Sequence, residues 1–124
     1  MRIIPAICPT GDSVEAGGDV IHEIDIEAYA VHHANGAVTI DVRETHEYLE
    51  AHVPGVILVP LSELADRADD LPEGPLLVIC RSGARSMRVC EFLSEQGREA
   101  TNVAGGTLAW IESGRDTVSG SDRG

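Results

Sequence analysis

The feature that most constrains this chain is a short apolar run that ends in a cysteine. Leu76–Ile79 is the most apolar segment of the sequence, and Cys80 follows it directly. A run of this length is too short for a buried helix and is typical of a central strand in a parallel sheet. Because Gly83 and a helical pattern from about Arg85 to Gln96 come next, we predict that Cys80 lies where a strand gives way to a helix.

The rest of the chain alternates in the same way between short apolar runs and helical patterns. Strands are expected near residues 20–24, 37–42, 56–59 and 100–103, and helices near 26–33, 45–51, 61–68 and 105–110. This alternation favours an α/β fold in which helices flank an open parallel sheet. Ligands bind such sheets beyond the carboxyl ends of the strands, and Asp41 and Cys80 both fall at that edge.

Length and composition indicate one domain with short appendages. The chain has 124 residues, of which 43% are hydrophobic, and this suits a single core. We predict a flexible N-terminal arm over residues 1–19, a domain over 20–116 and a disordered tail over 117–124. The N-terminal apolar run is too short for a signal peptide, and no stretch approaches the roughly 18 to 20 apolar residues of a membrane span. A cytoplasmic location is therefore expected.

The charge of the chain restricts its partners. There are 21 Asp and Glu residues against nine Arg and no Lys, so the formal net charge is −12. Such a chain repels nucleic acid and anionic membranes, and neither is expected as a partner. A small anionic substrate needs local positive groups instead. Arg81, Arg85 and Arg88 supply three of the nine cations within eight positions.

Three cysteines are present, and their spacing is neither a disulfide framework nor a metal-ligand pattern. Cys8, Cys80 and Cys90 are therefore expected to be reduced thiols, and we predict no metal and no cofactor. Cys90 falls on the inward face of its predicted helix and suits a core cysteine, with a resolving thiol as the alternative. Cys8 suits an incidental exposed thiol, with a sulfur-relay role as the alternative.

Cys80 differs from the other two because of its place before a helix. Backbone N–H groups of the turn converge there, and the helix dipole adds about half a positive charge. Both effects, and nearby guanidinium groups, lower the pKa of a thiol below about 8.5, the value for free cysteine. Gly83 allows the tight turn and a close approach of the backbone to a ligand. A reactive thiolate near neutral pH is predicted.

From Ile24 to Gly114 the chain carries a series of short motifs. They are Ile40–Glu44, Glu47–Tyr48, Ala51–Gly55, Val59–Leu61, Cys80–Ser86, Gly97 and Gly105–Trp110. In this order and spacing they resemble the rhodanese-like family. The resemblance implies a parallel sheet of about five strands flanked by helices, and a sulfurtransferase without a cofactor.

The resemblance also implies a mechanism and its residues. Cys80 would take the outer sulfur of thiosulfate or a related small anionic donor, release sulfite, and pass its persulfide to a thiol or to cyanide. Asp41 and Arg43 would support the loop from the neighbouring strand. The substrate-binding residues would be Arg81, Ser82, Gly83, Ala84, Arg85 and Ser86.

Two other functions stay open. The same cysteine would serve a persulfide carrier or regulatory module that exchanges sulfur with a relay protein. A cysteine phosphatase or arsenate reductase is disfavoured by loop length. Four residues separate Cys80 from Arg85, whereas cysteine phosphatases place one more residue before their arginine, at the position that Ser86 occupies here.

Overall fold

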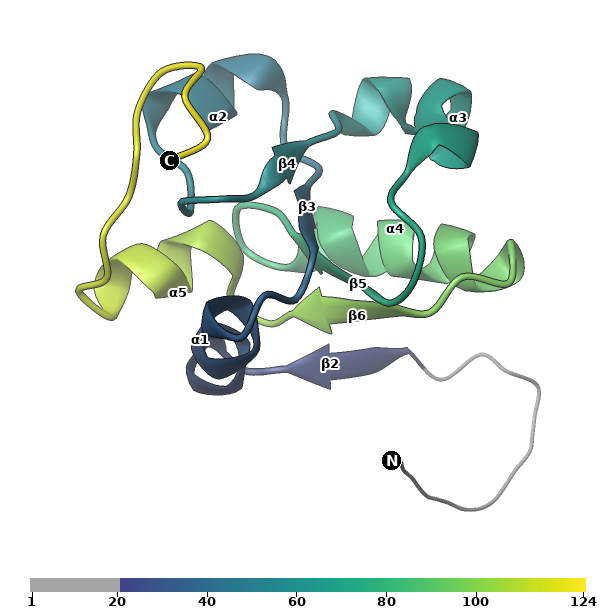
Figure 1. The fold of residues 1–124 in the computed structure, drawn as a ribbon, viewed down its shortest axis with the longest axis horizontal. Helices are drawn as coiled ribbons and strands as arrows, with labels where there is room; N and C mark the ends of the chain where they lie inside the picture. Colours follow the sequence, from purple (N-terminus) through teal and green to yellow (C-terminus); the bar gives the residue numbers. More distant parts are fainter. Residues whose placement is uncertain (1–20) are drawn as a thin grey trace.

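A computed structural model describes residues 21–124, which form a parallel five-stranded sheet flanked by helices (Figure 1). The strands lie side by side in the order β2-β6-β5-β3-β4, and each neighbouring pair is parallel. The predicted fold class is confirmed. In chain order the strands are β2 (His22–Ile24), β3 (Thr39–Asp41), β4 (Ile57–Leu58), β5 (Leu76–Ile79) and β6 (Ala100–Val103).

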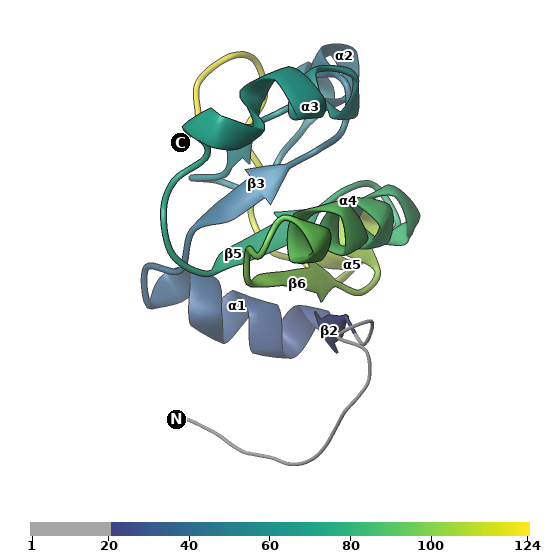
Figure 2. The same ribbon diagram turned by 90° about the vertical axis from the view of Figure 1, so that its right-hand side faces the viewer.

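Helices cover both faces of this sheet, and Figure 2 shows α1 and α4 on either side of β5 and β6. Short 3₁₀ turns at residues 61–63 and 68–70 flank α3, so the predicted helix over 61–68 is less regular than expected. The helices are α1 (Ile26–Ala34), α2 (Thr45–Glu50), α3 (Leu64–Arg67), α4 (Ala84–Glu95) and α5 (Gly106–Glu112).

The sheet divides the core into two apolar clusters because successive side chains of a strand point to opposite faces. In β5, Leu76 and Val78 pack with Val89 and Leu93 of α4. The alternate residues of β5 belong to the second cluster, which also contains Tyr29 of α1 and Trp110 of α5. Burial on both faces explains why β5 is a continuous apolar run rather than an alternating one.

The segment after α5 does not follow the prediction of a disordered tail over residues 117–124. Val118 forms a β-bridge with His52, and the C-terminal segment, yellow in Figure 1, lies beside α2. The buried His52 ring contacts the backbone oxygen of Asp122 at 2.7 Å and that of Tyr48 at 2.8 Å. Backbone groups make these contacts, so the small polar side chains of the tail gave no sign of them.

The remaining sequence predictions concern the ends of the chain and the membrane. Residues 1–19, and Cys8 with them, lie outside the described residues. Within residues 21–124, no helix is both long and apolar enough to cross a membrane.

Candidate active site

Cys80 lies between the carboxyl end of β5 and the start of α4, as its sequence context predicts. Cys80 is almost completely buried, with 1% of its surface exposed. Gly83, the N-cap residue of α4, has φ 107°, a left-handed conformation that favours glycine. Gly83 has no side chain that could cap this helix end. The first N–H groups of α4 are therefore available to another acceptor.

The sulfur of Cys80 is that acceptor. The Gly83 N–H donates to Sγ at 3.1 Å, and Ser86 Oγ lies 3.3 Å from Sγ. Burial raises the pKa of the Cys80 thiol, but hydrogen bonds from the Ser86 hydroxyl and from the N–H groups of Ser86, Gly83 and Ser82 together lower the pKa below its ordinary value. The site therefore favours a thiolate, which is the nucleophilic form of cysteine.

The first turn of α5 holds the backbone of the Cys80 loop in place. The N–H of Thr107 donates to the carbonyl of Cys80 at 2.8 Å, and the N–H of Leu108 donates to that of Arg81 at 3.0 Å. A Cβ atom on Gly106 would lie 2.4 Å from the Cys80 oxygen, so only glycine permits this approach. Sequence reasoning assigned no such role to Gly106, although two adjacent glycines at a helix start were its signal.

The three arginines near Cys80 have different environments. Arg85 donates two hydrogen bonds to Glu47 of α2, at 2.7 and 2.8 Å. Arg88 lines a groove between α3 and α4 together with Leu61 and Phe92. Arg81 is exposed in the loop. The arginine cluster of the sequence is thus divided between an ion pair, a groove and the loop.

Asp41 and Arg43 form a buried ion pair beside this loop. Arg43 Nη2 lies 2.9 Å from Asp41 Oδ2 and donates to the carbonyl of Ala51 at 2.8 Å. Asp41 is level with Ile79, the residue before Cys80, in the sheet register. Within the described part of the chain, the side-chain hydrogen bonds of the pair go to residues 41–51 rather than to the loop. Arg43 thus contacts the C-cap residue of α2, the helix whose Glu47 pairs with Arg85 at the start of α4.

A polar network behind the loop was missed by sequence reasoning. Asn102 of β6 is fully buried. Its side chain accepts a hydrogen bond from Ser86 Oγ and donates to Glu23 of β2 at 2.7 Å and to the carbonyl of Gly83 at 3.2 Å. The available signal was an amide in a strand that otherwise has buried apolar residues at Ala100 and Val103.

The ion pair between Glu47 and Arg85 predicts a pH dependence of stability. The Arg85 hydrogen bonds lower the pKa of Glu47 from 4.5 to about 2. A carboxyl whose pKa is lower in the folded state stabilises the fold above its unfolded pKa, and this contribution is lost as pH falls through the folded pKa. Glu47→Gln is therefore expected to reduce the free energy of unfolding by about 1–2 kcal/mol at pH 7.

Urea unfolding of wild type and Glu47→Gln between pH 7 and pH 2 measures this effect. The difference in unfolding free energy is expected to stay constant above pH 4.5 and to shrink between pH 4.5 and about 2. Glu63→Gln is the matched control, because its pair with Arg67 is 3.4 Å long and both side chains are exposed. Equal effects of the two variants at neutral pH would contradict the assignment.

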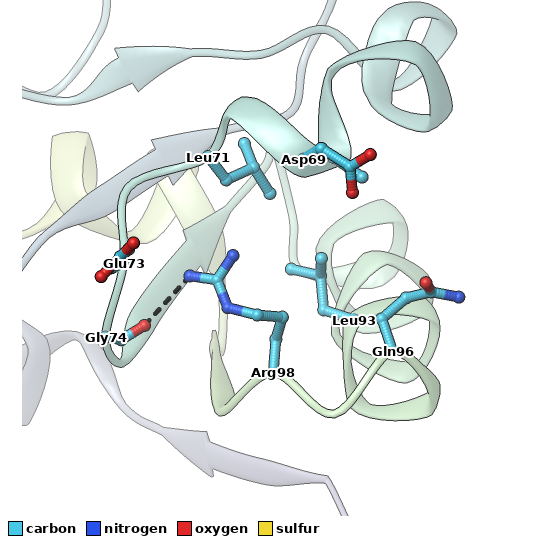
Figure 3. Close-up of a pocket in the computed structure, with 8 residues that line it drawn as sticks. Asp69, Leu71, Glu73, Gly74, Leu93, Gln96 and Arg98 are labelled. Atoms are coloured by element: carbon cyan, nitrogen blue, oxygen red, sulfur yellow. Dashed lines mark hydrogen bonds between the residues drawn. The ribbon is translucent and has the colours of Figure 1, made fainter.

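Two other features do not belong to the candidate site. Cys90 is fully buried in the core, as expected, and burial raises its pKa to about 12. A pocket of about 280 Å³ is lined by residues that include Leu71, Gly74 and Arg98 (Figure 3). Gly74 precedes β5, and Cys80 follows the other end of that strand. Arg98 in this pocket donates to the carbonyl of Gly74 at 3.1 Å, and it therefore stabilises a turn.

Comparison with known proteins identifies relatives of this chain. Residues 26–113 match the family described as "Rhodanese-like domain". A "Sulfurtransferase" from Allochromatium vinosum is 31% identical over 103 residues, which cover 80% of this chain and 96% of that protein. The "Putative sulfur carrier protein YrkF" of Bacillus subtilis is 36% identical over 104 residues. The match covers 81% of this chain but only 56% of that protein. A rhodanese-related protein from Thermoplasma volcanium has 32% identity and a TM-score of 0.73, over 78% of this chain and 97% of that one.

Proposed function

Because the chain belongs to the rhodanese-like domain family, we propose that it is a sulfurtransferase that carries sulfane sulfur on Cys80 and takes it from thiosulfate or a related donor. The observation that carries the proposal is the hydrogen bonding of the Cys80 sulfur, which accepts from the Gly83 N–H and the Ser86 hydroxyl. These donors stabilise an anionic sulfur where a strand meets a helix. A relative that is named a sulfurtransferase over nearly its full length supports the reaction class.

The proposed reaction has two steps. The Cys80 thiolate forms a bond to the outer sulfur of thiosulfate, the bond between the two thiosulfate sulfurs breaks, and its electron pair leaves with sulfite. Cys80 then bears a persulfide anion. A thiophile such as cyanide attacks the terminal sulfur and leaves as thiocyanate, and the electrons of the broken S–S bond restore the thiolate.

The loop has separate roles in this reaction. The N–H groups of Ser82, Gly83 and Ser86 stabilise negative charge on sulfur, and exposed Arg81 is the cation of the loop that meets an incoming anion. Arg85 acts indirectly, because its ion pair with Glu47 fixes the start of α4 against α2. Ala84 begins α4 and makes its contribution through the backbone.

A persulfide carrier is the second candidate. The similarity to a protein named as a sulfur carrier, over 81% of this chain, favours it. Carrier and enzyme need the same stabilised sulfur, so they differ in the acceptor. An enzyme turns over with thiosulfate and cyanide, whereas a carrier accepts one sulfur and passes it efficiently only to a partner protein.

Intact-protein mass after treatment with thiosulfate and desalting tests the proposal. The double variant Cys8→Ser, Cys90→Ala retains Cys80 as its single thiol, and we expect it to gain one sulfur, which cyanide then removes as thiocyanate. Steady thiocyanate production would identify an enzyme. A single discharge without turnover would identify a carrier. If the free thiol gains no sulfur from thiosulfate or from a persulfide donor, the proposed function is wrong.

A further inference from the structure

The direction of the Asn102 amide follows from its surroundings. The two ends of an amide have nearly the same shape, so its hydrogen-bond partners decide which end faces which way. One end faces the Glu23 carboxylate at 2.7 Å and the Gly83 carbonyl at 3.2 Å. Both partners accept only, so this end is the NH₂ group. The amide oxygen must therefore face Ser86.

The Ser86 hydroxyl consequently has two acceptors for one hydrogen. Its oxygen contacts Asn102 Oδ1 on one side and lies 3.3 Å from Cys80 Sγ on the other. When Cys80 is a neutral thiol, its S–H can donate to Ser86 while the hydroxyl donates to Asn102. When the thiol has lost its proton to solvent, the hydroxyl must turn toward the sulfur. Asn102 then loses this donor, and in a fully buried position the loss costs free energy.

We propose that Asn102, oriented by Glu23, is a positioning residue that competes with the Cys80 sulfur for the Ser86 hydroxyl and so tunes how readily that sulfur becomes and remains an anion. The inference rests on the proposed role of Cys80. Glu23 is an exposed residue of the edge strand β2, so it can be substituted without opening the core.

Two titratable groups of α4 lie near this network, and neither changes its charge near neutral pH. Arg85 at the start of α4 is held protonated by Glu47, which raises its pKa. Cys90 of α4 stays neutral because burial raises its pKa to about 12. A change in the ionisation of Cys80 near neutral pH is therefore not caused by titration of Arg85 or Cys90.

Competition predicts opposite effects for two neighbouring deletions. Ser86→Ala removes a donor to the thiolate and is expected to raise the pH midpoint of Cys80 alkylation. Asn102→Ala removes the competing acceptor and is expected to lower that midpoint, with alkylation roughly three- to tenfold faster below it. If Asn102 only supported the loop, Asn102→Ala would raise the midpoint instead, because a loosened loop loses its N–H contacts to the sulfur.

The test is the pH profile of iodoacetamide alkylation, followed at Cys80 by peptide mass, in a double-mutant cycle. In the Ser86→Ala background, Asn102→Ala is expected to leave the midpoint unchanged, because the hydroxyl through which it acts is gone. A midpoint that rises with Asn102→Ala, or that shifts equally in both backgrounds, would overturn the proposal.

Glu23→Gln provides a second test at an exposed position, in case the core variant does not fold. Glutamine can present an NH₂ donor where the carboxylate only accepts, so the Asn102 amide can turn over and the midpoint is expected to fall. If only the loss of the Glu23 charge mattered, the midpoint would shift equally with and without Ser86. The proposed effect requires the Ser86 hydroxyl, so it is expected only when Ser86 is present. None of these measurements uses a sulfur donor. Midpoints that shift as expected in a protein that takes up no sulfur would uphold the network and reject the proposed function.

Discussion

Cys80→Ser is expected to take up no sulfur from thiosulfate, with a loss of sulfur transfer on the order of 10³-fold or more. The serine oxygen can accept the hydrogen bonds that now reach the sulfur from Gly83 and Ser86. A serine hydroxyl nevertheless stays protonated near neutral pH, and it cannot form the S–S bond of a persulfide. The fold is expected to persist, so the loss is chemical.

Intact-protein mass after thiosulfate treatment measures this loss, and thermal unfolding checks the fold. Cys90→Ala is the matched control, because Cys90 is also a fully buried thiol but its pKa is raised rather than lowered. This control is expected to load one sulfur. Uptake by folded Cys80→Ser that matches the wild type would mean that the sulfur is carried by another residue.

Gly106→Ala is expected to destabilise the fold by roughly 2–5 kcal/mol and to slow alkylation of Cys80. The added Cβ would lie 2.4 Å from the carbonyl oxygen of Cys80 and 2.7 Å from that of Arg81. Both are backbone atoms that α5 holds by hydrogen bonds. Relief of the clash must therefore move the loop, and this weakens the N–H contacts that stabilise the thiolate.

Urea unfolding and the pH profile of alkylation measure the two parts of this effect. Gly97→Ala is the control, since Gly97 also has a left-handed backbone, φ 81°, but no described atom lies within 4 Å of the place that its Cβ would take. Its cost is expected to be about 1 kcal/mol, from the backbone alone. Similar losses for the two variants would show that the contact between α5 and the loop is unimportant.

The strand–loop–helix unit around Cys80 was predictable because its determinants are local. An apolar run that ends in a cysteine, followed by Gly83 and a helical pattern, is sufficient to place a sulfur at a helix N-terminus. The alternation of strands and helices was predictable for the same reason, and the parallel sheet confirms it. The order of short motifs then indicated the family, which the match over residues 26–113 confirms.

The role of the arginines was harder to predict because charge pairing depends on distant residues. Three arginines close together in the sequence suggested a common anion site. In the fold, α2 brings Glu47 to Arg85 across 38 positions of the chain. The lowered pKa of Cys80 follows, after the opposing effect of burial, from hydrogen bonds of Ser86, Gly83 and Ser82. The Ser86 hydroxyl and three backbone N–H groups lower this pKa, and composition does not reveal the direction in which they point.

The sequence by itself therefore determined the type of fold, the family and the position of Cys80 between a strand and a helix, since each follows from periodicity and from motifs of neighbouring residues. Only the tertiary structure decided what surrounds that cysteine. Gly106 lies against its carbonyl group, Asn102 of β6 accepts a hydrogen bond from the Ser86 hydroxyl beside it, and Glu23 of β2 accepts one from the Asn102 amide. These contacts join residues far apart in the chain. Their energies depend on distances of a few tenths of an ångström, which arise only when the helices pack against the sheet.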